Sequence, residues 1–167
     1  FRIPAIAVTG DGTLVAFAEG RVISSADPGA GDPIDVVYKR SVDGGRTWTG
    51  LSVLADGDTN IGAFQPTVVV DIEGGRNWLW VFYNYRNATN TRPLDKGLVA
   101  KFSDDNGLTW SSQINYNYLN PGGTSNFTAN IASGIQMLNG RLVIPMKIKF
   151  NGKDSQPTVI YSDNNGV

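Results

Sequence analysis

Two arginines near the N-terminus have the type and spacing to bind an anion. Arg2 lies in the motif F-R-I-P at residues 1–4, and Arg21 ends the next apolar stretch of the chain. Arginine is rarely a core residue, and two guanidinium groups at neighbouring strand ends can hold a carboxylate through bidentate, charge-assisted hydrogen bonds. We therefore predict an anion site at Arg2 and Arg21. The alternative is that these arginines form surface salt bridges, for example with Glu19 or Asp27.

The loop that follows Arg21 carries two candidate acids. Asp27 is directly followed by Pro28, and Asp32 by Pro33, in a segment rich in Ser, Pro and Gly. A carboxylic acid beside an anion site can protonate a leaving group when partial burial raises its pKa. Asp27 and Asp32 are both candidates for this general acid. An aspartate before proline is also typical of a turn, so a purely structural role is the alternative for Asp27.

The composition excludes several other chemistries. The 167 residues include no cysteine and no histidine, which rules out disulfides, thiolate metal sites and imidazole bases. The formal net charge is -1, from 14 basic and 15 acidic residues, and no long run of one sign suggests a nucleic acid or membrane-surface partner. No apolar run is long enough for a spanning helix. We expect no cofactor and no metal, and catalysis by carboxylate, tyrosine, arginine or lysine side chains.

An all-β fold must position these residues. Short stretches rich in β-branched and aromatic residues alternate with clusters of Gly, Asn, Asp and Pro, and no window has a helical period. Tight turns are predicted at residues 10–12 and at residues 139–140, where Asn-Gly is typical of a type I′ hairpin. The predicted strands are residues 3–8, 13–18, 35–41, 67–71, 78–83, 97–102, 133–137, 141–147 and 157–161.

The pattern S-x-D-x-G-x-T-W recurs along the chain. It occupies residues 41–48 and 103–110, and a third copy begins at residues 162–166 with Asn164 at the aspartate position. The spacing suits one four-stranded β-propeller blade with an elaborated loop. The pattern resembles the Asp box of sialidases and other propellers, in which Ser and Asp bond turn amides, glycine takes a positive φ and tryptophan covers the gap between sheets. We interpret the boxes as structural.

The N-terminal motifs together resemble the start of the exo-α-sialidases. That family carries F/Y-R-I-P, then F-A-E-x-R, then a loop aspartate, and this sequence has them at residues 1–4, at residues 17–21 and at Asp27, ahead of the first Asp box. The resemblance covers essentially the whole chain. It implies a six-bladed β-propeller of which about the first three blades are present, with residues 1–167 as the N-terminal part of one catalytic domain.

The resemblance also implies roles for individual residues. Arg2 and Arg21 look like two members of the arginine triad that binds the carboxylate of sialic acid, and Asp27 looks like the acid/base that protonates the glycosidic oxygen. The parent protein would be an exo-α-sialidase that releases terminal sialic acid with retention from glycoproteins, glycolipids or oligosaccharides. In the family the tyrosine nucleophile, its glutamate and the third arginine lie C-terminal to this region. The chain alone is therefore expected to be inactive.

Two further positions are candidates for the sugar pocket. Many family members have an aspartate before Pro-Thr or Pro-Ser at the start of the second blade, and this chain has Gln65 there, which keeps hydrogen bonding but loses the charge. Tyr85, which follows the predicted strand at residues 78–83, is the second candidate. Both would contact substituents of the sugar.

Two other functions are compatible with the sequence. A catalytically inactive propeller that binds sialylated or acidic glycans would keep the Asp boxes and could keep the arginines. A trans-sialidase would differ only in acceptor-site residues that the sequence does not reveal. For either function, as for the hydrolase, we expect a secreted, cell-surface or lumenal protein, and the sequence predicts no oligomeric state.

Overall fold

The described part of the protein is built from β-strands. A computed structural model describes residues 1–23, 33–57, 61–87, 96–122 and 124–166. Within these ranges the helical elements are the short turns η1 (Glu73–Gly75) and η3 (Asn117–Leu119), and none has the length and apolar character needed to cross a bilayer. The strands are β1 (Arg2–Val8), β2 (Leu14–Arg21), β3 (Ile34–Ser41), β4 (Ser52–Ala55), β5 (Ile61–Asp71), β6 (Trp78–Asn87), β7 (Lys96–Ser103), β8 (Ile114–Asn115), β9 (Thr124–Ala129), β10 (Ile135–Gln136), β11 (Leu142–Phe150) and β12 (Ser155–Ser162).

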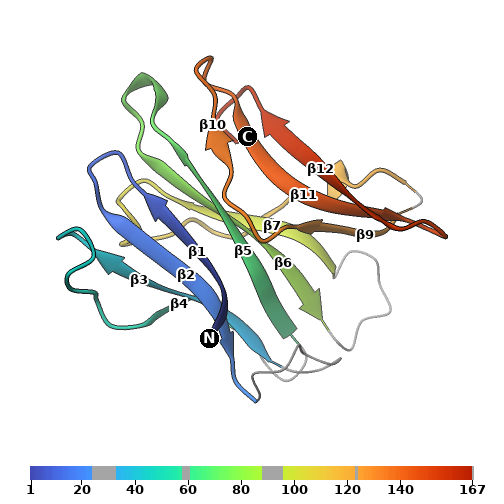
Figure 1. Cartoon of the computed structure of the whole chain (residues 1–167), viewed down its shortest axis with the longest axis horizontal. Coiled ribbons are helices and arrows are strands. Elements are labelled where there is room, and N and C mark those ends of the chain that lie inside the picture. The colour runs from blue at the N-terminus through green and yellow to red at the C-terminus, as the bar shows by residue number, and fades with distance from the viewer. Residues whose placement is uncertain (24–32, 58–60, 88–95, 123, 167) are drawn as a thin grey trace.

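Three antiparallel groups of strands follow one another along the chain (Figure 1), the first two within one eight-stranded sheet and the third as a four-stranded sheet. The first is formed by β1 to β4 and the second by β5 to β8, and a single parallel pairing of Ile34 with Gly62 joins them. In the third, β12 lies on one side of β11, while β9 and β10 share the other side as one interrupted strand. Consecutive strands pair as in successive propeller blades. The predicted all-β, propeller-type fold is confirmed, and the number of blades stays a prediction.

Both faces of the second blade are buried, which explains why its strand β6 is so rich in apolar residues. In β6, Leu79, Val81 and Tyr83 pack in a cluster shared with the first blade, while Trp80 and Phe82 pack in a cluster shared with the third. A strand covered on both faces needs apolar side chains at every position, because neither face meets water. Each large side chain buried in this way contributes about 1.5–3 kcal/mol.

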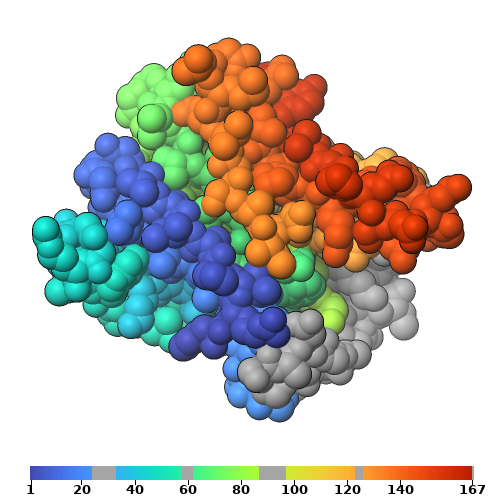
Figure 2. Space-filling view, viewed as in Figure 1, coloured from blue at the N-terminus to red at the C-terminus, as the bar shows by residue number. Residues whose placement is uncertain are grey.

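The inner strands of the three blades lie side by side. β5 contacts β1 on one side and β9, β10 and β11 on the other. Figure 2 shows the dark-blue N-terminal strand and the orange third blade on the same face of the molecule. β1 therefore contacts the first two blades, and the third blade lies against the other side of β5.

The Asp boxes fold as the sequence predicts. In the first box, Ser41 Oγ accepts the Gly45 N–H at 2.8 Å, and Asp43 accepts the N–H and the hydroxyl of Thr47 at 2.9 and 2.6 Å. The box at residues 103–110 repeats these contacts. The boxes are thus hydrogen-bonded turns, in agreement with a structural role.

The tryptophan of the second box covers the gap between two blades, as predicted. The Trp110 ring lies edge-on to the rings of Phe17 and Tyr38 in the first blade, with centroid distances of 5.9 and 5.5 Å. Edge-to-face aromatic pairs add about 0.5–1.5 kcal/mol to the burial of their surface. The second box therefore helps to fix the first blade against the second.

Acid is expected to weaken the second Asp box. Burial raises the pKa of Asp105, but hydrogen bonds from Thr109 and Ser103 outweigh burial and lower the pKa to about 2. Because the ordinary value is 3.8, the ionised carboxylate stabilises the fold fully above that pH and loses this contribution as the pH falls to about 2. We expect Asp105→Asn to lower the Tm of the whole protein by roughly 1–3 °C at pH 7 and by less at pH 2.5, since the residue is only partly buried.

Thermal unfolding of the wild type and the variant between pH 2.5 and 7 checks this expectation. The third box supplies the control, because Asn164 accepts the Ser162 hydroxyl at 2.7 Å without a titratable group. Asn164→Ala should change the Tm by the same amount at every pH. A Tm difference for Asp105→Asn that does not depend on pH would contradict the role of the lowered pKa.

The strand prediction missed three strands. β4 and β8 are short outer strands of four and two residues, too brief to show an alternating pattern. β9 has the sequence TSNFTA, in which only Phe127 and Ala129 are apolar. All three are recognisable only through their pairing with β3, β7 and β11.

The hairpin predicted before β11 is present, but the predicted turn type is wrong. Gly140 has a φ of 83°, whereas Asn139 does not take the positive φ that a type I′ turn requires. The Gly140 N–H donates to the Met137 carbonyl, and the Met137 N–H donates to the Arg141 carbonyl. These bonds define a three-residue loop with a type I turn and a glycine bulge.

Candidate functional site

Four strand ends meet at the end of the blades opposite the Asp boxes, here called the site end. Each box follows the C-terminal end of the third strand of its blade. The antiparallel order therefore places the starts of β1 and β5, and the ends of β2 and β6, at the opposite end. In Figure 1 the N-terminus lies at this end, away from the β1–β2 and β5–β6 hairpins.

The inner strands of the first two blades carry the same irregularity at the site end. Their pairing shifts by one residue between Arg2 and Ala5 in β1 and between Phe64 and Thr67 in β5. Ile3 and Gln65, each followed by proline, have φ values of 55° and 57°. Positive φ is unfavourable for residues with a Cβ atom, and such strained positions cluster at functional sites.

Arg21 and Glu19 form a buried ion pair at the end of β2. Arg21 Nε and Nη2 donate to Glu19 Oε2 at 2.9 and 2.8 Å, and the two side chains are 6% and 3% exposed. The predicted alternative of a salt bridge to Glu19 is thus present, but it is buried. Two contacts to one oxygen of a buried carboxylate hold the guanidinium in one orientation, so Arg21 is fixed at the edge of the site.

Glu19 also connects the first blade to the second. Its second oxygen, Oε1, accepts the Gln65 backbone N–H at 3.0 Å. This bond satisfies the amide at the strained left-handed position of β5. One carboxylate therefore fixes both the Arg21 side chain and the backbone of the neighbouring blade.

A second set of hydrogen bonds extends from Gln65 to the third blade. Asn84 Nδ2 donates to Gln65 Oε1 at 2.8 Å, and the Ala129 N–H donates to Asn84 Oδ1 at 2.8 Å. Asn84 is 1% exposed. In addition, the Thr67 hydroxyl donates to the Asn130 carbonyl. A continuous polar network thus runs from Arg21 through three blades.

The structure places four of the five predicted site residues, Arg2, Arg21, Gln65 and Tyr85, at or near this network. Arg2 is exposed at the start of β1 and pairs across the strands with Glu19, two residues before Arg21. Gln65 is part of the network itself. Tyr85 is half-buried and packs against the cluster between the first two blades, on the face of β6 opposite Asn84.

The candidate acids Asp27 and Asp32 lie outside the described residues. The described chain stops shortly after Arg21 and resumes just before β3. The structure therefore gives the strand ends that flank this loop but no geometry for either carboxyl group. Their assignment as general acid stays a prediction.

Two residues at the site end were missed from the sequence. Asn84 pairs with Phe64 as Glu19 pairs with Arg2, so Asn84 occupies in the second blade the position of Glu19 in the first. Arg86 then corresponds to Arg21, and its guanidinium carbon lies 5.6 Å from the centroid of the Phe64 ring. The shared spacing of E-G-R and N-Y-R is the signal that could have revealed both.

Two buried tyrosines are held in the protonated form. Burial, followed by proximity to Tyr85, raises the pKa of Tyr83, whose hydroxyl donates to Gln113 at 2.9 Å. Burial, followed by proximity to Tyr118, raises the pKa of Tyr116 to about 12. A tyrosine needs a lowered pKa or an adjacent base to act as a nucleophile, so Tyr83 and Tyr116 are unsuited to that role.

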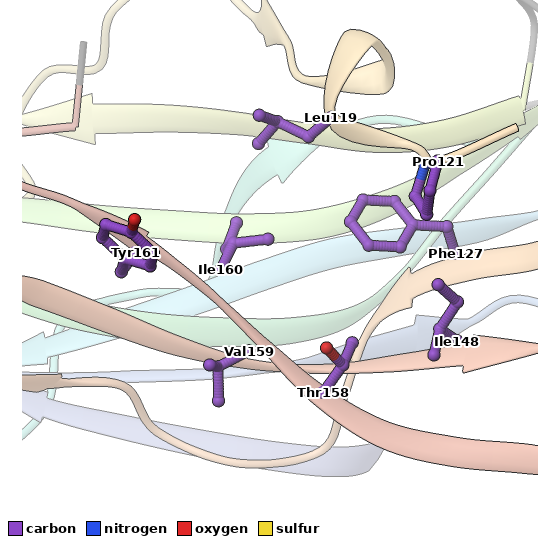
Figure 3. A pocket seen from close by; sticks show the side chains of 8 residues that line it. All are labelled: Leu119, Pro121, Phe127, Ile148, Thr158, Val159, Ile160 and Tyr161. Carbon is purple, nitrogen blue, oxygen red and sulfur yellow. The ribbon is translucent and has the colours of Figure 1, made fainter.

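The hollow in Figure 3 has a different character from the site end. It has a volume of about 500 Å³ and its side chains are mainly apolar, with only the hydroxyls of Thr158 and Tyr161 as polar groups (Figure 3). It contains no charged side chain, so it offers no partner for a carboxylate. The described residues also contain no group of three carboxylates placed to hold a metal ion. The lining residues are Leu119, Pro121, Phe127, Ile148, Thr158, Val159, Ile160 and Tyr161.

Comparison with known proteins gives consistent matches. Residues 3–167 match the sequence model of the BNR repeat-like domain. The chain is 33% identical over 183 residues to a sialidase of Micromonospora viridifaciens, covering 99% of this chain and 28% of the relative. It is 30% identical over 182 residues to a sialidase of Paraclostridium sordellii, covering 99% of this chain and 44% of the relative. The chain thus spans less than half the length of these curated relatives.

A solved structure shows the same arrangement of strands. The Hadza microbial sialidase Hz136 superposes with a TM-score of 0.87 at 25% sequence identity. The superposition covers 99% of this chain and 35% of that protein. The similarity extends over all three blades described above.

Proposed function

The chain belongs to the sialidase family with BNR repeats, and we propose that the protein of which it is part is an exo-α-sialidase. The proposal rests mainly on the buried Arg21–Glu19 pair beside the exposed Arg2 at one end of the blades. Two guanidinium groups at adjacent strand ends suit a carboxylate, which is the ionised group of sialic acid. We propose a terminal sialic acid on a glycoprotein, glycolipid or oligosaccharide as the substrate.

In this proposal the chain supplies the carboxylate-binding groups and the acid. Arg2 and Arg21 bind the carboxylate and orient the sugar ring. Asp27 protonates the glycosidic oxygen as the bond to the leaving group breaks, and then removes a proton from the water that releases the product. A tyrosine nucleophile with its glutamate and a third arginine would come from other parts of the protein, which gives retention through a covalent intermediate.

Hydrolysis of a fluorogenic sialoside by the whole protein tests the proposed function. We expect turnover, with the α-anomer of sialic acid as the first product seen by proton NMR. Adding lactose as an acceptor and analysing the products by mass spectrometry distinguishes hydrolysis from transfer. Calorimetric binding of sialic acid without turnover would instead indicate an inactive glycan-binding propeller. A protein that neither cleaves sialosides nor binds sialic acid would refute the proposal.

A further inference from the structure

The backbone of Ala129 fixes the direction in which the Asn84 side-chain amide points. The Ala129 N–H donates to Asn84 Oδ1 at 2.8 Å, and Asn84 Nδ2 lies 3.3 Å from the Ala129 carbonyl oxygen. A backbone N–H can only donate, so the atom that faces it must be the amide oxygen. In a buried residue a reversed amide would place two donors against each other, which is costly. The orientation of Asn84 therefore follows from the backbone.

The orientation of Asn84 determines that of Gln65. Asn84 Nδ2 is a donor and lies 2.8 Å from Gln65 Oε1. A reversed Gln65 would again set two NH₂ groups against each other, so its oxygen must face Asn84. Gln65 Nε2 then points away from Asn84, and none of the described residues accepts a hydrogen bond from it.

The Gln65 amide belongs to the same cluster as Arg21. Its backbone N–H donates to one oxygen of Glu19, while Arg21 donates to the other. Guanidinium groups and an amide nitrogen can only donate hydrogen bonds, whereas an aspartate or glutamate at position 65 could only accept them. The site end is therefore rich in donors and complementary to an oxygen-rich ligand.

We infer that Gln65 presents an N–H donor to the substrate and that Asn84 is the positioning residue that holds Gln65 in this orientation. The inference rests on the proposed function and adds a specificity determinant to it. Gln65 selects a sialoside that carries a hydrogen-bond acceptor, a hydroxyl or carbonyl oxygen, where the sugar meets Nε2. Asn84 acts only through Gln65.

NMR of the side-chain amides tests the orientation without relying on activity. In the whole protein labelled with ¹⁵N, the NH₂ protons of Asn84 should be protected from exchange with water, and those of Gln65 should exchange rapidly. In Asn84→Asp the carboxylate can only accept, so the Gln65 amide should reverse and its protons should become protected. The Gln65→Met spectrum assigns the Gln65 signal by its loss. Protected Gln65 NH₂ protons in the wild type would overturn the inference.

A cycle of protein and substrate variants tests the specificity. The substrates are a fluorogenic sialoside, its 4-deoxy analogue and an analogue with a hydroxyl in place of the 5-N-acetyl group. Gln65→Met is expected to lower kcat/KM for the parent about 10-fold and to leave it unchanged for the analogue that lacks the recognised oxygen. Asn84→Asp should alter the same selectivity in the wild type and have no further effect on it in the Gln65→Met background.

A matched control comes from another hydrogen-bonded glutamine. Gln113 accepts the Tyr83 hydroxyl in the second blade, and Gln113→Met should leave the ratios of kcat/KM as in the wild type. Equal losses for Gln65→Met on all three substrates would overturn the inference. An effect of Asn84→Asp that persists in the Gln65→Met background would do the same. If the wild type cleaves none of the substrates, the proposed function fails and the NMR result alone decides the orientation.

Discussion

Asp27→Ala in the whole protein is expected to lower kcat/KM for sialyllactose by about 10²–10⁴-fold, the range that a general acid–base residue contributes. The leaving alkoxide of lactose is strongly basic and needs a proton as the bond breaks. An aryl sialoside has a less basic leaving group, so its loss should be clearly smaller. Steady-state kinetics on the two substrates measure this difference, and the pH profile of kcat/KM should lose its alkaline limb.

Asp32→Ala is the matched control for this prediction. Both aspartates precede a proline in the loop after Arg21, so both variants change the loop in a similar way. We expect Asp32→Ala to stay within a few-fold of the wild type on both substrates. A large, leaving-group-dependent loss for Asp32→Ala instead would transfer the acid role to Asp32. Small losses for both variants would show that this loop does not supply the acid.

The local features of the fold were predictable because their causes are local. The Asp box at residues 41–48 contains all the donors and acceptors that define its turn, so its pattern alone indicates its hydrogen bonds. The buried strand at residues 78–83 is apolar at every position, which only a strand covered on both faces requires. Local sequence patterns of this kind predict the type of fold without any information on contacts between distant residues.

The network at the site end was not predictable in the same way. Glu19, Gln65, Asn84 and Ala129 belong to three blades, and none of them stands out by type. Their contacts depend on the bulge at Gln65, where the pairing shifts and φ becomes positive. Neither glutamine nor a following proline indicates a left-handed residue in a strand. The sequence did predict that Gln65 belongs to the site. The direction in which its side-chain amide points followed only from the structure.

Glu19→Ala is expected to destabilise the whole protein by about 3–5 kcal/mol. Removing one partner of a buried ion pair leaves the other, here the Arg21 guanidinium, as an unpaired buried charge. The carboxylate accepts two bonds from Arg21 and one from the Gln65 N–H, and all three are lost together. Glu19→Gln keeps the shape and one acceptor, so its cost should be nearer 1–3 kcal/mol. Urea denaturation of the three proteins measures these differences. The exposed Arg141–Asp163 pair is the control, and Asp163→Ala should change the stability far less, because solvent screens an exposed pair.

The double variant Glu19→Met, Arg21→Met separates the structural role of the pair from its role in binding. Replacing both ions by apolar side chains of similar size removes the buried charge as well as its partner, which is often nearly neutral for stability. We therefore expect the double variant to regain most of the stability lost in Glu19→Ala. Its KM for a sialoside should nevertheless rise at least 10-fold, since one guanidinium of the carboxylate site is gone. A stable double variant with the KM of the wild type would show that Arg21 only holds the blades together and that Arg2 binds the carboxylate without it.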